Sequence, residues 1–228
     1  MLARSIWQRH TSAPAVATFY STAFPLTENP ISEGGIYTQG LSTGLDWQDC
    51  RTTPGKCFAT GDSGASGFND PIMVMANRWT NNKHYSQATI FKQAGYAPSA
   101  AHEIELHVGT TITAHSVKTY EVNWALGTPV TVIRWDGAVG VFDFAMASPT
   151  SGTAFTCTHG DVIKAVYNAT SGNVVIDCYL NGVLGCTFTD STAGKILTGS
   201  PGWGFFARPA GDIVLSNYCF SAGSLGNA

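Results

Sequence analysis

Apolar and polar residues alternate along most of the chain in short runs that Gly, Pro, Asn and Asp separate. This period of two is typical of half-buried β-strands, and no window longer than about ten residues keeps a helical period. So many short runs without an intervening helix predict an all-β protein, an antiparallel two-sheet jelly-roll sandwich. The expected strands are 56–59, 72–76, 85–93, 102–108, 116–126, 128–135, 139–146, 161–167, 173–180, 183–189, 203–207 and 212–219.

The segment Val174–Asp190, VVIDCYLNGVLGCTFTD, carries the sharpest local signal. Two β-rich runs flank Asn181-Gly182, the dipeptide that most strongly indicates a two-residue hairpin turn. A strict register from this turn predicts that Cys178 and Cys186 project from opposite faces, which disfavours a disulfide between them. The same register places Phe188 on the polar face, and either a β-bulge or a strand covered on both faces would resolve this conflict.

Charged residues make up only 12% of the chain, which excludes a highly charged disordered protein and a coiled coil. Lys and Arg number 12 against 15 Asp and Glu, with a net charge of -3 and no basic cluster, so we expect no nucleic-acid partner. No apolar run reaches the roughly 18 residues of a spanning helix, and the start of the chain lacks the apolar core of a signal peptide. We therefore expect no membrane partner and synthesis in a cytoplasm.

The chain divides into two expected regions. Residues 1–20 form an N-terminal arm, and residues 21–228 form a single jelly-roll domain, because no repeat, charge run or linker divides them. Residues 38–70 are rich in Gly, Thr and Asp and predict a long loop region that holds one short strand at 56–59.

The six cysteines contain no CxxC pair, and cytoplasmic synthesis favours reduced thiols. We therefore expect most of them to be unpaired, with several buried as small apolar side chains. The best candidate for a bridge is Cys50–Cys57, which would close a short loop that contains Pro and Gly.

Four segments, taken in order, resemble a known superfamily. They are FPLTENPISEGG at 24–35, the strand pair between 85 and 108, GDVIKAVY at 160–167 with the strand and turn of 174–182, and DST followed by GSPGWGF between 190 and 205 with the closing strand 212–220. Together they resemble the concanavalin A-like lectin/glucanase superfamily in its laminin-G-like jelly-roll form. Domains of this kind occur in secreted glycan enzymes, in lectins and in bacteriophage structural proteins, and the fold alone does not set the function.

The segment HEIELH at 102–107 holds the candidate chemistry of the chain. On a strand, Glu103, Glu105 and His107 share one face, and two such carboxylates could approach the separation of about 5–5.5 Å found in retaining glycosidases. The glucanases of the resembled superfamily carry Glu-x-Asp-x-x-Glu, whereas this strand has no third acid. We therefore predict no catalytic residues and no enzyme, and we keep these three side chains as candidates for ligand binding on the polar face of a sheet.

Asp62, Asn69 and Asp70 in the loop region could supply oxygen ligands to calcium, which laminin-G-like domains often bind. Their spacing does not match that of the ligands in a calcium-binding loop, and the histidines and cysteines lack the paired spacing of a zinc site. No Gly-x-Ser-x-Gly elbow stands between a strand and a helix, which argues against a nucleophilic triad. We expect no metal ion and no cofactor.

These patterns favour a non-enzymatic virion structural protein of a bacteriophage, either a capsid decoration or cement protein or a tail-associated one. The charge is low, and the fold is usually extracellular although no export signal is visible. The expected partners are other virion proteins in a symmetric homo-oligomer or capsid lattice, which Ile6 and Trp7 of the arm would contact. The alternative is a carbohydrate-binding module or a glycan-cleaving enzyme that binds surface glycans on the concave sheet face.

Overall fold

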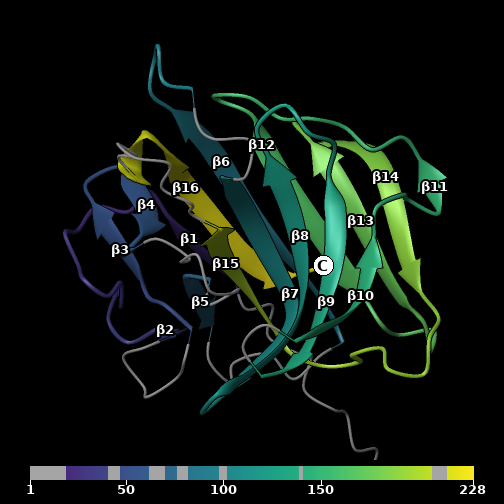
Figure 1. Cartoon of the computed structure of the whole chain (residues 1–228). Coiled ribbons are helices and arrows are strands. Elements are labelled where there is room, and N and C mark those ends of the chain that lie inside the picture. The colour runs from purple at the N-terminus through teal and green to yellow at the C-terminus, as the bar shows by residue number, and fades with distance from the viewer. Residues whose placement is uncertain are drawn as a thin grey trace, which may run out of the picture.

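The computed structural model describes residues 19–40, 47–61, 70–75, 82–97, 102–138, 141–206 and 215–228. Within these ranges, two antiparallel sheets stack face to face (Figure 1). The predicted all-β sandwich is therefore confirmed. In the part of the chain that the structure describes, no helix is long and apolar enough to cross a membrane.

The larger sheet has nine strands in the order β11-β14-β13-β12-β6-β16-β4-β3, and β1 pairs with β16 beside this path. Its strands are β1 Phe19–Thr22, β3 Cys50–Thr53, β4 Lys56–Ala59, β6 Lys83–Lys92, β11 Ser151–Gly152, β12 Val162–Asn168, β13 Val174–Leu180, β14 Val183–Asp190 and β16 Tyr218–Asn227. A short 3-10 turn, η1 Leu215–Asn217, leads into β16.

The smaller sheet has seven strands in the order β10-β9-β8-β7-β15-β5-β2. Its strands are β2 Tyr37–Gln39, β5 Ile72–Met75, β7 Glu103–Thr113, β8 Ser116–Ala125, β9 Thr131–Gly137, β10 Phe142–Met146 and β15 Ser200–Phe206. Strands β7 and β8 form a long hairpin, and β15 returns from far along the chain to pair with β7.

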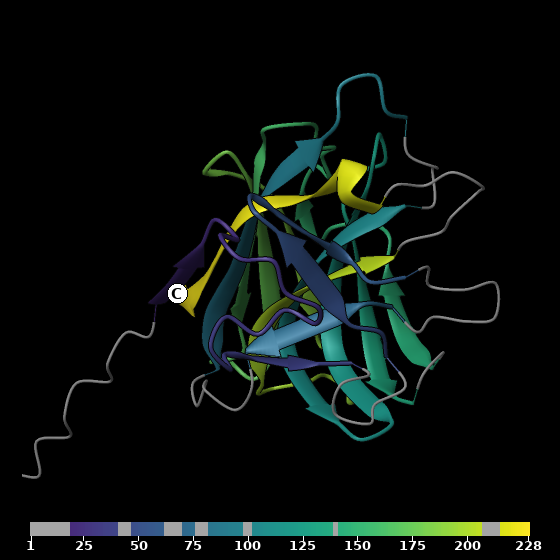
Figure 2. The same cartoon turned by 90° about the vertical axis from the view of Figure 1, so that its left-hand side faces the viewer.

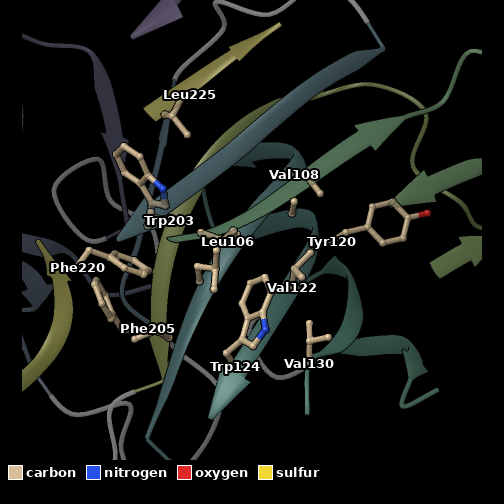
Figure 3. Packing of buried hydrophobic residues seen from close by; sticks show 14 of the residues in the cluster. Leu106, Val108, Tyr120, Val122, Trp124, Val130, Trp203, Phe205, Phe220 and Leu225 are labelled. Carbon is tan, nitrogen blue, oxygen red and sulfur yellow. The ribbon is translucent and has the colours of Figure 1, made fainter. Parts of the chain in front are cut away.

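The hydrophobic core lies between the two sheets, because each strand turns every second side chain inward. In β12, Ile163, Ala165 and Tyr167 are buried while their neighbours are half-exposed. Figure 3 shows Phe205 of β15 beside Phe220 of β16, with ring centroids 4.8 Å apart. Each such buried side chain contributes about 1.5–3 kcal/mol of transfer free energy, so this layer dominates stability.

A buried polar bridge also ties the sheets together at β14. Arg134 of β9 donates to Asp190 of β14 at 2.5 Å, and the Tyr120 hydroxyl of β8 donates to the same carboxylate oxygen at 2.7 Å. Burial alone would raise the pKa of Asp190, but these bonds and those from Thr192 outweigh it and hold the pKa below its ordinary value. The carboxylate is therefore ionised and paired at neutral pH.

The hairpin β13–β14 corrects one prediction. Leu180 pairs with Val183 as the turn predicts, but a β-bulge follows, and Cys178 then pairs directly with Cys186. The expectation that these two side chains project from opposite faces is wrong. Glycine tolerates the bulge at position 185, where a Cβ would lie 2.4 Å from the Phe155 ring. The bulge also returns Phe188 to the core, which resolves the register conflict.

The end of the chain corrects a second prediction. The closing strand is not 212–219 but β16, which starts at Tyr218 and runs through the Gly- and Ser-rich tail to Asn227. The tail pairs with β6 on one side and with β1 on the other. Figure 2 shows the marked C-terminus beside β1. The order of the tail therefore comes from its own sandwich and requires no neighbouring chain.

Several strands were absent from the sequence prediction, namely β1, β2, β3 and β11. Strand β1 starts at Phe19, so paired structure begins inside the segment expected to be an arm. The proposed arm contacts Ile6 and Trp7, and the loop residues Asp62 and Asn69, lie outside the described residues.

Candidate functional site

The outer face of the seven-stranded sheet brings the predicted site residues together. Glu103, Glu105 and His107 alternate along β7 with core residues, and the register sets them opposite Ala125, Asn123 and Glu121 of β8. The predicted common face is therefore observed. Glu121 and Asn123 join it from the neighbouring strand, and no motif in the sequence had marked them.

This face is not open where these residues lie. Glu105 is 0% exposed and His107 is 2% exposed, whereas Glu103 is half-buried and accepts a hydrogen bond from Asn123. A small apolar cluster lies on the same side of the sheet and consists of Trp47, Ile72, Val74, Val117 and Trp135. Trp47 meets Trp135 edge to face at 5.2 Å, and the Trp135 indole donates to Glu121, so this cluster borders the polar residues.

His107 is a neutral imidazole in a hydrogen-bond chain. Its Nε2 lies 3.0 Å from the Glu105 carboxyl, and its Nδ1 lies 3.1 Å from the Thr119 hydroxyl. Burial lowers the pKa of His107 to about 3, so its contact with Glu105 is a hydrogen bond and not an ion pair at neutral pH. Gly204 of β15 makes room for this chain, because a Cβ there would lie 2.4 Å from the imidazole Nε2.

Three buried carboxyl groups converge beside the histidine. Asp70, Glu105 and Glu121 place oxygen atoms within 4.8 Å of one another, and the Trp135 indole donates to Glu121 at 2.5 Å. Burial raises the pKa of Glu105 well above its ordinary value, and Glu121 and Asp70 raise it further. Three carboxylates this close require bound protons or a hard cation, since oxygen donors suit such ions. The sequence had marked Asp70 as an oxygen donor to a metal and Glu105 as a candidate for ligand binding, but it had not marked Glu121.

A surface hollow of about 340 Å³ lies along β1 and the segment that follows it, and none of its lining residues belongs to this buried cluster. It is lined by Tyr20, Ser21, Thr22, Ala23, Pro25, Leu26 and Glu33. The Tyr20 hydroxyl donates to one oxygen of Glu33, and the Thr22 hydroxyl donates to the other at 2.5 Å. Burial raises the pKa of Glu33 to about 7. The hollow therefore combines a ring, hydroxyls, apolar groups and one carboxyl group that titrates near neutrality.

The hollow was not predicted, because Tyr20 falls in the segment expected to be an arm and no strand was expected in the part of the domain that holds the other lining residues. Glu33 has a left-handed backbone, with φ 43°, in the turn that carries it toward β1. The sequence marked this segment as part of a family resemblance, ENPISEGG, without assigning a role to its acid.

The sequence matches no protein family and no curated protein. The fold does have solved counterparts. The carbohydrate recognition domain of Emp46p in its potassium-bound form superposes with a TM-score of 0.54 at 11% identity, over 90% of this chain and 95% of that chain. This chain has the concanavalin A-like lectin/glucanase fold.

Enzymes share this concanavalin A-like sandwich. The β-porphyranase BpGH16B from the human gut bacterium Bacteroides plebeius superposes with a TM-score of 0.51 at 8% identity, over 95% of this chain and 94% of that chain. The GH43 protein BlXynB from Bacillus licheniformis superposes with a TM-score of 0.51 at 12% identity, over 91% of this chain and 39% of that larger chain. At these identities the similarity speaks for the fold alone.

Proposed function

We propose that this chain is a non-catalytic carbohydrate-binding module whose sugar site is the hollow between Tyr20 and Glu33. The observation that carries the proposal is the composition of this hollow, an aromatic ring and exposed apolar groups around one carboxyl group. Its volume of about 340 Å³ suits a site for a small ligand, which usually spans about 300–1,000 Å³.

The chemistry of the hollow matches that of a sugar ring. A sugar presents hydroxyl donors on its edge and C–H groups on its faces. An ionised Glu33 accepts hydroxyl hydrogens in charge-assisted bonds, which are stronger than neutral ones. Leu26, 51% exposed, and the ring of Tyr20 supply apolar surface for the C–H faces.

The non-catalytic part of the proposal rests on the other face. A glycosidase needs two carboxyl groups that reach the substrate. Glu105 is fully buried and Glu103 is half-buried, so of the paired acids on β7 only Glu103 approaches the surface. This arrangement favours a structural role for the acids of β7 and leaves ligand recognition to the hollow.

The proposal is tested by measuring binding to a panel of immobilised neutral and acidic oligosaccharides. Calorimetry then gives the affinity for any glycan that binds. Glu33→Gln should weaken binding about tenfold, which is about 1.4 kcal/mol. Because protonation removes the acceptor charge, affinity should rise as pH increases through about 7, and Glu33→Gln should abolish that rise. Asp177→Asn is the matched control, since Asp177 is also half-buried and accepts a threonine hydroxyl.

If the protein binds none of the glycans on the panel, the proposal of a carbohydrate-binding module is wrong. If the wild type and Glu33→Gln bind a glycan with equal affinity, the proposed location of the site is wrong. The virion role expected from the sequence stays a prediction, since the arm residues that would make its contacts lie outside the described residues.

A further inference from the structure

Two cysteines face each other across the hairpin β13–β14. The register pairs Cys178 directly with Cys186, and their exposed fractions are 0% and 1%. Asp177, the neighbour of Cys178, pairs with Thr187 on the opposite face of the same hairpin. The two thiols therefore project together into the space between the sheets.

This placement meets the geometric requirement of a disulfide. Directly opposed residues of antiparallel strands have Cα atoms about 4.5–5.5 Å apart, and disulfides join Cα atoms about 4.4–6.8 Å apart. Each thiol also shifts the pKa of the other, because a hydrogen bond from Cys178 to Cys186 would raise the pKa of Cys178 and lower that of Cys186. A bridge between them therefore requires no change in the pairing of the two strands.

The bridge candidate suggested by the sequence is less well placed. In the hairpin β3–β4, Cys50 pairs with Ala59 and Cys57 pairs with Thr52, so the two cysteines are diagonal neighbours. Diagonal positions lie about 7–8 Å apart, beyond the usual span of a disulfide. The Cys57 sulfur instead lies 3.9 Å from the Met73 sulfur. This second pair provides an internal comparison in the same protein.

The hairpin lies near one end of its sheet. Among the described strands, only the two-residue β11 lies beyond β14. Strand pairs at such an end open locally at less cost than central strands, which gives a small oxidant access to buried sulfur. The hydrogen bond from Cys178 lowers the pKa of the Cys186 thiol, so Cys186 supplies the thiolate that attacks first.

We propose that Cys178 and Cys186 are a redox modification site, which closes into a cross-strand disulfide when a low-molecular-weight disulfide such as oxidised glutathione reacts with it. The Cys186 thiolate attacks one glutathione sulfur, breaks the S–S bond and releases one glutathione thiolate. Cys178 then loses its proton to solvent and attacks the Cys186 sulfur, which releases the second glutathione as thiolate. The protein loses two electrons and two protons, and oxidised glutathione gains the electrons.

The test treats the folded full chain with oxidised glutathione, blocks free thiols, and maps disulfides by peptide mass spectrometry. Two of the six thiols should become resistant to alkylation, and one linked peptide should contain Cys178 and Cys186. Reduction should restore both thiols, and the oxidised form should melt about 5 °C higher. Cys178→Ser should stop at a glutathione adduct on Cys186, while Cys57→Ser should leave the bridge intact.

Six alkylatable thiols after oxidation, or a bridge only between other cysteines, would overturn the proposal. Peptide mapping of the wild-type protein decides this even where a serine variant fails to fold.

Discussion

At the scale of single residues, Glu105 shows how burial sets protonation. Its carboxyl group lies beside Asp70 and Glu121 in a space that water does not reach, so the fold favours the protonated form. The folded protein therefore holds a proton that the unfolded chain releases above the ordinary pKa of 4.5. It follows that the free energy of unfolding should fall as pH rises from about 4.5 toward the raised pKa.

Glu105→Gln removes this titration while keeping the shape of the side chain. At pH about 7 the variant should be more stable than the wild type by on the order of 1 kcal/mol, and its stability should depend less on pH. Urea unfolding between pH about 5 and 8 measures both effects. Glu103→Gln, a half-buried control on the same strand, should retain the pH dependence. A less stable Glu105→Gln at neutral pH would show instead that the fold holds the ionised carboxylate.

At the scale of elements, the turn of the hairpin β13–β14 combines two left-handed residues. Asn181 has φ 50° and Gly182 has φ 81°, the combination that a two-residue primed turn requires. This local chemistry is why the sequence located the hairpin correctly. The sequence also located β4 at its observed bounds, but it missed β1, β2, β3 and β11, which have only two to four residues each and show little periodicity.

Gly182→Ala should destabilise the protein by roughly 1 kcal/mol, because a Cβ strains a backbone with positive φ. Thermal and urea unfolding measure the loss. Val183→Ala at the adjacent position, which is 70% exposed, should change stability by no more than about 0.5 kcal/mol. Equal stability of Gly182→Ala and the wild type would mean that another turn type closes this hairpin.

At the scale of the whole molecule, the C-terminal strand β16 joins parts of the larger sheet that lie far apart in the sequence. The tail of β16 is an interior strand that pairs with both β6 and β1, and Leu225 is fully buried (Figure 3). Among the described residues, the first paired one is Phe19 of β1, whose partner lies in β16. The sandwich therefore depends on its last residues.

Removal of residues 1–18 should leave a folded protein with nearly unchanged thermal unfolding, whereas removal of residues 221–228 should prevent folding. The tail deletion exposes the edge of β6 and removes the partner of β1, so its cost exceeds that of a side-chain change. Circular dichroism and thermal melts compare the two truncations. If the virion prediction holds, the first truncation should also lose incorporation into particles. A tail deletion that still folds would contradict the conclusion that the sandwich depends on β16.

The features that could be predicted from the sequence are those that depend only on neighbouring residues. Alternation of side chains is a local property of a strand, so the order of residues alone placed Glu105 and His107 on one face of β7 and Leu106 on the other. Whether that face is open depends on the tertiary structure, because residues far from β7 in the sequence, such as Asp70 and Gly204, pack beside Glu105 and His107. The same holds for the carboxyl cluster and for the bulge that joins Cys178 to Cys186. Both features depend on packing between segments, which the periodicity of a single strand does not predict.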